Sequence, residues 1–173
     1  MRKEYKRVLI ENFTYKFLQR VNGFSKTQKR SSIGLITFAK RIEPSEISVF
    51  VRLFPDPKRE AFTVEVGWTC PSASPDVLQY GQPSASRKEF KRADFICRVG
   101  SLCGQDDRWW HVEPKLNPFT DDSVEYMKRS LEPVSSEQAL SRIAPLVEDA
   151  LDKIILFGLP YLDEYLRASD AGQ

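Results

Sequence analysis

Three consecutive segments of this chain alternate apolar and polar residues with the two-residue period of half-buried β-strands. They span residues 36–42, 47–53 and 62–68. In such a pattern successive side chains point to opposite faces of a sheet, so one face is buried. The links, Glu43-Pro44-Ser45 and Pro55-Asp56-Pro57, are short and rich in turn-forming residues. Because links this short cannot hold a crossover helix, the three strands are predicted to pair antiparallel as a meander.

Two further strands are predicted at residues 93–99 and 108–112, joined by a turn over residues 100–104. Before them lies the least regular part of the chain, residues 69–92, which is rich in proline, glycine and serine. A connection of that length is unusual inside a compact domain and is often functional. We therefore treat residues 69–92 as a long insertion loop and as a candidate flap.

Helical periodicity occurs toward both ends of the chain. Residues 2–21 carry apolar side chains at every fourth position, which is typical of a helix with one buried face. Asn22-Gly23 follows, and glycine readily adopts the left-handed conformation that ends helices. Near the other end, Ser135 with Gln138 three residues later forms a capping box, which predicts the start of a second long helix.

The C-terminal helix is expected to be interrupted. Pro145 should kink it or divide it in two, because proline lacks the N–H that the helix needs. Gly158 is expected to end it, and a last short helix is predicted over residues 161–166. Residues 168–173 have the composition of a disordered tail. A further short helix is predicted over residues 120–130, where acidic residues fill the first turn.

The order of one helix, about five antiparallel strands and then several helices defines the α+β class. We expect the first and last helices to cover one face of the sheet. A chain of 173 residues can bury about 70% of the surface that its unfolded form exposes. A single domain is therefore predicted over residues 1–167, with the insertion loop inside it and a short tail behind it.

The formal net charge of +2 hides an uneven distribution of charge. Residues 1–41 hold eleven basic and two acidic side chains, whereas residues 121–173 hold five basic and eleven acidic ones. Such asymmetry can mark a surface for an anionic partner. It can equally mean that the two ends of the chain lie against each other. If the first and last helices share a face of the sheet, mutual compensation is favoured.

Several classes of protein are disfavoured. No apolar run approaches the roughly 20 residues that a membrane span needs, and no apolar signal core follows the charged N-terminus. We therefore predict a cytoplasmic protein with no membrane partner. Three cysteines without a C-x-x-C pair and a single histidine argue against a disulfide framework and against a metal site. A glycine-rich phosphate loop is absent from the sequence too, so no cofactor is predicted.

The best candidate for chemistry is the segment from Trp109 to Glu113. On a strand, Trp109, His111 and Glu113 project to one face and the two residues between them to the other. A carboxylate diagonal to an imidazole can raise its basicity, which makes His111 and Glu113 a candidate acid–base pair. No nucleophile is placed beside them by spacing, so a histidine packed beside two tryptophans is the simpler interpretation. Trp109 is the indole expected to face solvent and to bind a partner.

A basic cluster lies at the end of the insertion loop. Arg87, Lys88, Lys91 and Arg92 are interleaved with an aromatic residue, and Tyr80 lies earlier in the same loop. Such residues can contact phosphates, and binding of that kind is strongly salt-dependent. Charge runs in loops are often only solvated, and the pI of about 8.4 is below that of a dedicated nucleic-acid domain. These five residues are candidates for binding.

Three segments together carry a resemblance. They are the helix closing on Asn22-Gly23-Phe24, the strand Phe62-Thr63-Val64-Glu65-Val66-Gly67, and the late run Phe157-Gly158-Leu159-Pro160-Tyr161-Leu162. In order and character they resemble a group of small bacterial domains of unknown function. The insertion loop departs from the compact pattern of that group. The resemblance implies a bacterial α+β domain and no particular activity.

The sequence therefore predicts a non-enzymatic cytoplasmic domain that binds another macromolecule, with a protein as the favoured partner. An immunity-type or accessory role suits the size by analogy. The predicted contact surface is the insertion loop with the sheet edge that carries Trp109, because loops on a rigid scaffold concentrate binding residues. One alternative is a nucleic-acid-associated protein that uses the basic N-terminal and loop residues. Another is an enzyme in which His111 and Glu113 act as an acid–base pair.

Overall fold

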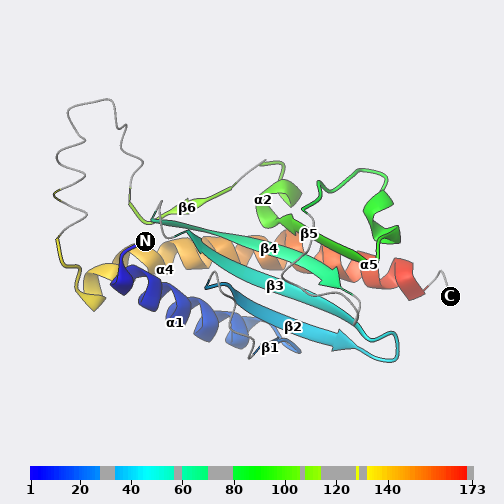
Figure 1. Cartoon of the computed structure of the whole chain (residues 1–173), viewed down its shortest axis with the longest axis horizontal. Helices are drawn as coiled ribbons and strands as arrows, with labels where there is room; N and C mark the ends of the chain where they lie inside the picture. Colours follow the sequence, from blue (N-terminus) through cyan, green and yellow to red (C-terminus); the bar gives the residue numbers. More distant parts are fainter. Residues whose placement is uncertain are drawn as a thin grey trace.

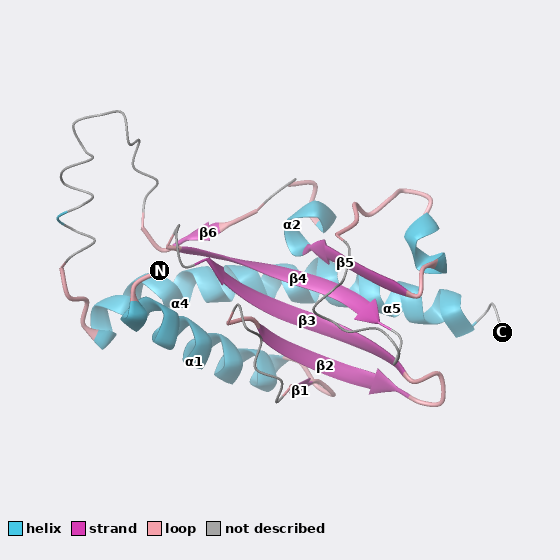
Figure 2. Cartoon of the chain, in the orientation of Figure 1, coloured by secondary structure: helices cyan, strands magenta, loops and turns pink. Residues whose placement is uncertain are grey.

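The structure, a computed structural model, describes residues 1–27, 34–56, 60–69, 80–105, 108–113, 128 and 132–170. Within these residues six strands form one sheet in the order β1-β2-β3-β4-β5, with β6 paired to β4 (Figure 2). All neighbouring strands are antiparallel, so the predicted meander is confirmed for its first strands. The strands are β1 Ser25–Lys26, β2 Ile36–Ile42, β3 Ile47–Asp56, β4 Ala61–Thr69, β5 Asp94–Arg98 and β6 Trp110–His111.

Two long helical stretches lie on one side of this sheet (Figure 1). The arrangement confirms the α+β class with an N-terminal helix and C-terminal helices packed on the sheet. Short helical turns sit between the last strands. The helical elements are α1 Lys3–Arg20, the 3-10 helix η2 Lys88–Lys91, α2 Val99–Leu102, α4 Ser136–Lys153, the π-helix η3 Ile154–Gly158 and α5 Leu159–Asp170.

The core lies between the sheet and these helices. Alternate residues of β4 point toward the helices, which places the core on that face of the sheet. They are fully buried and belong to one apolar cluster with residues of α1, α4 and α5: Phe62, Val64, Val66 and Trp68. Burying one such side chain contributes roughly 1.5–3 kcal/mol to folding. Trp68 is thus a core residue, as its place in the alternating set predicts.

α1 and α4 pack side by side and run in the same direction. Ser136 at the start of α4 donates to Glu4 of α1 at 2.6 Å, and Arg20 at the end of α1 donates to Asp152 of α4 at 2.6 Å. Glu148 accepts from Arg20 at 2.9 Å and from Lys16. We call this contact, made by Glu4, Arg7, Lys16 and Arg20 with Ser136, Glu148 and Asp152, the helix seam. It confirms that the basic first helix and the acidic last third of the chain compensate each other.

The C-terminal helices differ from prediction in three places. Pro145 does not divide α4, because it lies on the exposed side, where water can satisfy the carbonyl that its missing N–H leaves. Gly158 does not end the helix: η3 continues directly into α5. A Cβ on Gly158 would lie 3.2 Å from Val66, so glycine lets this turn approach β4 closely. Residues 168–170 belong to α5 and not to a tail. The capping box of Ser135 is confirmed.

The last two strands also differ. The predicted turn over residues 100–104 begins as the helix α2, and a Cβ on Gly100 would lie 2.7 Å from Arg108. The strand predicted over residues 108–112 is reduced to β6, which pairs with the beginning of β4 and not with β5. β4 is long enough to pair with β6 at one end and with β5 at the other.

Part of the predicted insertion loop has regular structure. Thr69 is the last residue of β4, and η2 occupies residues 88–91. We call residues 80–92 the 80–92 loop; residues 70–79 lie outside the described residues. So does the helix predicted over residues 120–130, apart from Lys128, and so do residues 171–173 of the predicted tail.

Candidate functional site

The 80–92 loop begins against the edge of the sheet at β5. Tyr80 forms an isolated bridge with Ile96, and the Gly81 N–H donates to the Ile96 carbonyl at 2.9 Å. A Cβ on Gly81 would lie 2.2 Å from the Phe95 ring. Glycine therefore allows the loop backbone to lie flat against β5, and the beginning of the loop is fixed by backbone contacts.

The end of the loop is fixed by the aromatic part of the core. The Phe90 ring lies edge-on to Trp68 at 5.7 Å and to Tyr161 at 5.3 Å. The Trp68 indole N–H donates to the Arg92 carbonyl at 3.0 Å. Loops that are closed at both ends and packed by their own side chains hold a defined shape and are frequently functional.

The acidic residue of the loop, Glu89, faces inward. It is 6% exposed, and its carboxylate accepts from the Ser84 N–H at 3.0 Å, the Ser84 hydroxyl at 2.6 Å and the Tyr161 hydroxyl at 2.9 Å. Burial alone would raise the pKa of Glu89, but these hydrogen bonds outweigh it and hold the pKa below its ordinary value. The Glu89 carboxylate therefore bonds to Ser84 and Tyr161 and does not pair with Lys88, its neighbour in sequence.

The outer side of the loop is basic. Lys88, Lys91 and Arg92 are exposed, and none of them forms an ion pair with another described residue. Arg87 differs, because its guanidinium pairs with Glu164 of α5 at 3.1 Å, which raises the pKa of Arg87. Of the four predicted basic residues, three are thus solvent-facing on an anchored turn, and one holds the loop to α5.

The sheet face opposite the helices carries a row of charged residues. Glu65 on β4 lies in register between Arg52 on β3 and Arg98 on β5, and it is 0% exposed. The Tyr80 hydroxyl donates to the Glu65 carboxylate. Burial raises the pKa of Glu65, and these partners oppose the shift. The Arg98 guanidinium lies 5.7 Å from the Tyr80 ring and 4.9 Å from the Trp109 ring. Two predicted binding residues, Tyr80 and Trp109, are therefore brought together around Arg98.

Trp109, His111 and Glu113 do not share one face as predicted. Trp109 packs edge-on against Phe54 at 5.8 Å and is half-buried, whereas Trp68 and Trp110 are buried. Trp109 is therefore the most exposed of the three indoles, as expected, but it faces solvent only in part. His111 is half-buried in β6 opposite Ala61. Glu113 follows the end of β6, and its carboxylate reaches the helices. Because β6 has two residues, the alternation of a strand does not extend to residue 113.

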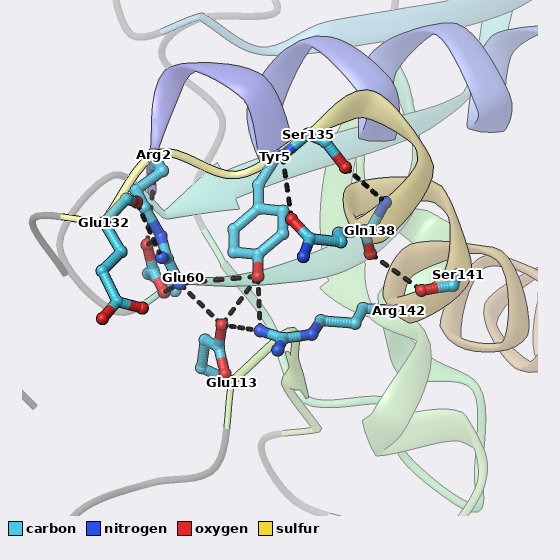
Figure 3. A network of polar contacts seen from close by, with 9 residues as sticks. All are labelled: Arg2, Tyr5, Glu60, Glu113, Glu132, Ser135, Gln138, Ser141 and Arg142. Carbon is cyan, nitrogen blue, oxygen red and sulfur yellow. Dashed lines mark hydrogen bonds and ion pairs between the residues drawn. The ribbon is translucent and has the colours of Figure 1, made fainter. Parts of the chain in front are cut away.

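Glu113 lies at the centre of a polar network (Figure 3). Its Oε1 atom accepts from Arg2 Nη2 at 2.6 Å, from the Tyr5 hydroxyl at 2.6 Å and from Arg142 Nη1. Arg2 also forms a bidentate pair with Glu60, at 2.8 and 3.1 Å. Burial raises the pKa of Tyr5 to about 12, and the bond to Glu113 adds to the shift. We call these five residues the Glu113 centre.

The Glu113 centre joins four distant parts of the chain. It links the N-terminus, the link between β3 and β4, the end of β6 and the middle of α4. Three donors, from Arg2, Tyr5 and Arg142, converge on Oε1 of Glu113. This arrangement favours a structural role for Glu113 over a role as the acid–base partner of His111. Of its five residues, sequence analysis singled out Glu113 alone.

A pocket of about 160 Å³ adjoins the Glu113 centre, lined in part by Tyr5, Glu132, Gln138 and Arg142. Among the described residues, no group of three or more His, Cys, Asp or Glu side chains is placed to hold a metal ion. None of the described helices is long and apolar enough to cross a membrane.

Comparison with known proteins adds no assignment: no protein-family model, no curated protein and no solved structure matches this chain.

Proposed function

We propose that this chain is a protein-binding domain and that the 80–92 loop is its contact surface. One observation carries the proposal: Lys88, Lys91 and Arg92 face solvent without an ion pair in the described part of the chain, on a turn that the core holds in place. Basic residues of the helix seam, by contrast, are paired with acids. Among the described residues, Lys88, Lys91 and Arg92 contribute no ion pair to this fold, and their charges remain available to a partner.

The physical properties of the loop suit recognition of an acidic protein surface. An anchored backbone loses little conformational entropy on binding, which leaves more of the contact energy as affinity. Clustered cations attract an acidic partner and orient its approach. Tyr80, at the beginning of the loop, is 57% exposed and supplies aromatic contact area. An immunity-type or accessory role in the cytoplasm, in which the chain acts on one protein, belongs to the same proposal.

A nucleic acid is the alternative partner for such a surface. Three cations would neutralise few phosphates, and the pI of about 8.4 is below the value near 9 that is typical of nucleic-acid domains. An acidic residue of α5, Glu164, also adjoins the loop, since it pairs with Arg87. These facts favour a protein.

The test is a comparison of two triple variants. Lys88→Gln/Lys91→Gln/Arg92→Gln removes the loop cations, and Lys3→Gln/Lys26→Gln/Lys128→Gln removes three exposed lysines elsewhere. Both lower the net charge equally, so they separate position from total charge. Immobilised wild-type chain is incubated with an extract of cells that produce it, the bound protein is identified, and its affinity for each variant is measured by titration. The loop variant should bind roughly tenfold more weakly at low salt.

The control variant should bind like the wild type. Equal affinity of both triple variants would overturn the assignment of the contact surface. Bound material that disappears on nuclease treatment would replace the protein partner with a nucleic acid.

A further inference from the structure

The pocket beside the Glu113 centre has opposite charges on its two sides. Glu132 lies on one side of the Tyr5 side chain, and Gln138 and Arg142 lie on the other (Figure 3). Tyr5 is fully buried and, with Glu113, belongs to the inner wall. The lining therefore carries two cations, Arg2 and Arg142, and two carboxylates, Glu113 and Glu132, with Glu132 toward one end and Arg142 toward the other.

The groups at both ends still have bonding capacity. Arg142 is 48% exposed in its side chain, and within the described residues its Nη1 alone is engaged, which leaves Nε and Nη2. Gln138 uses its Oε1 to accept from the Ser135 N–H at 3.1 Å, which leaves its NH₂ group to donate. At the other end the Glu132 side chain is exposed and takes part in none of the described contacts, although its backbone carbonyl accepts from Arg2.

A ligand with a single charge can satisfy only one of the two ends. A simple carboxylate near Arg142 would also meet the carboxylates of Glu113 and Glu132, and a simple ammonium near Glu132 would meet Arg2 and Arg142. A molecule with both charges satisfies both ends at once. The volume of about 160 Å³ is below the roughly 300–1,000 Å³ of pockets for drug-sized ligands. The ligand must therefore be small.

We propose that this pocket binds a small zwitterion, an α-amino acid with a short side chain. Its carboxylate lies against the free edge of Arg142 and the Gln138 amide, and its ammonium group lies toward Glu132. The two ends of the pocket admit one orientation, because the reverse orientation places like charges together at both ends. This site is separate from the 80–92 loop and does not depend on the proposed protein partner.

Glycine is the probe that tests this site. It is titrated into the ¹⁵N-labelled full chain, and the amide signals of Val134, Gln138 and Arg142 are followed by NMR. We expect saturable shifts with a dissociation constant on the order of 1 mM. Acetate and methylammonium, each at the same ionic strength, should bind about tenfold more weakly, because each leaves one charged end of the pocket unsatisfied.

Two variants locate the contacts. Glu132→Gln keeps every bond of the Glu113 centre and should weaken glycine binding about tenfold. Arg142→Gln should weaken it at least as much, and its spectrum shows independently whether the fold survives. Arg20→Gln, which removes a cation of the helix seam, should bind glycine like the wild type.

Three results would each overturn the site. One is that the amide signals of Val134, Gln138 and Arg142 do not shift when the glycine concentration is ten times the expected dissociation constant. Another is acetate or methylammonium binding as tightly as glycine. The third is unchanged glycine affinity in Glu132→Gln.

Discussion

The helix seam and the 80–92 loop both bring several basic side chains together, yet they treat the charge in opposite ways. In the seam, Arg20 of α1 meets Glu148 and Asp152 of α4, residues more than a hundred positions away. In the loop, the nearest acid in sequence, Glu89, is turned inward to Ser84 and Tyr161. In the seam, the fold pairs basic side chains with acidic ones. In the loop, it leaves Lys88, Lys91 and Arg92 exposed to solvent.

This difference shows that a run of basic residues predicts a binding surface only when the acidic residues that could pair with it are known to lie elsewhere. By count alone, residues 1–41, with eleven basic side chains, are the better candidate for an anionic partner. Ion pairs between α1 and α4 engage two of these cations, Lys16 and Arg20, and partly neutralise them, so the count of basic residues overstates the charge that is available to a partner. The shorter run in the loop keeps its charge exposed.

The largest expected effect concerns the anchor of the loop. Phe90→Ala removes the ring that packs against Trp68 and Tyr161, and it should lower the free energy of unfolding by about 3 kcal/mol. Urea denaturation measures this change. Amide hydrogen exchange should also accelerate at Gly81, whose N–H bonds to β5.

The control is Leu18→Ala on α1, because Leu18 is apolar but exposed. It should change the free energy of unfolding by less than about 0.5 kcal/mol. Equal costs for the two variants would mean that the core does not hold the loop, and the comparison with the seam would lose its basis.

The next effect concerns the inward acid. Glu89→Gln weakens the bonds from Ser84 and Tyr161 and should cost about 1–2 kcal/mol at pH 7. The pKa of Glu89 is lowered in the fold, so its contribution is complete above the unfolded-state pKa near 4.3 and is lost as the pH falls through the folded-state pKa. Urea denaturation of both proteins at neutral and acidic pH measures it. The gap between them should shrink on acidification; a gap that stays constant or grows contradicts this role.

Much of the fold follows from local patterns. The alternation in residues 36–42, 47–53 and 62–68 identifies three strands, since each has one face in the core. The capping box of Ser135 marks the first turn of α4 through contacts three residues apart. By contrast, Gly158 permits a close approach to β4, which is a tertiary contact, and the same glycine in an isolated helix would be an end signal.

The site was less predictable because its contacts join distant segments. Glu113 was identified, but its partners Arg2 and Arg142 come from elements whose placement depends on the whole fold. Arg52 and Glu65 carried a usable signal: they are equidistant from the link between β3 and β4, so hairpin register pairs them. Tyr80 gave no local indication that its hydroxyl would reach a buried carboxylate.

A smaller effect is expected in the helix seam. Arg20→Gln removes the pairs with Glu148 and Asp152 and should cost about 0.5–1 kcal/mol at low salt, because both acids are largely exposed. Thermal unfolding at low and high ionic strength measures it. The cost should fade at high salt, since exposed pairs are screened. Lys26→Gln, at an exposed lysine of β1, is the control and should show no such salt dependence; a cost that persists at high salt would show that the seam acts through packing.

The smallest effect on the free energy of unfolding is expected for the exposed basic residues of the 80–92 loop. Lys88→Gln/Lys91→Gln/Arg92→Gln should change the free energy of unfolding by less than about 0.5 kcal/mol, because these side chains have no ion pair to lose within the described structure. Removing three neighbouring cations relieves their mutual repulsion, whereas the change at Arg92 also removes the guanidinium that lies 5.9 Å from the centre of the Phe95 ring, so the two effects offset each other. Urea denaturation of this triple variant and of Arg20→Gln measures and compares their free energies of unfolding. If the triple variant is the less stable of the two, the loop cations stabilise the fold as those of the seam do.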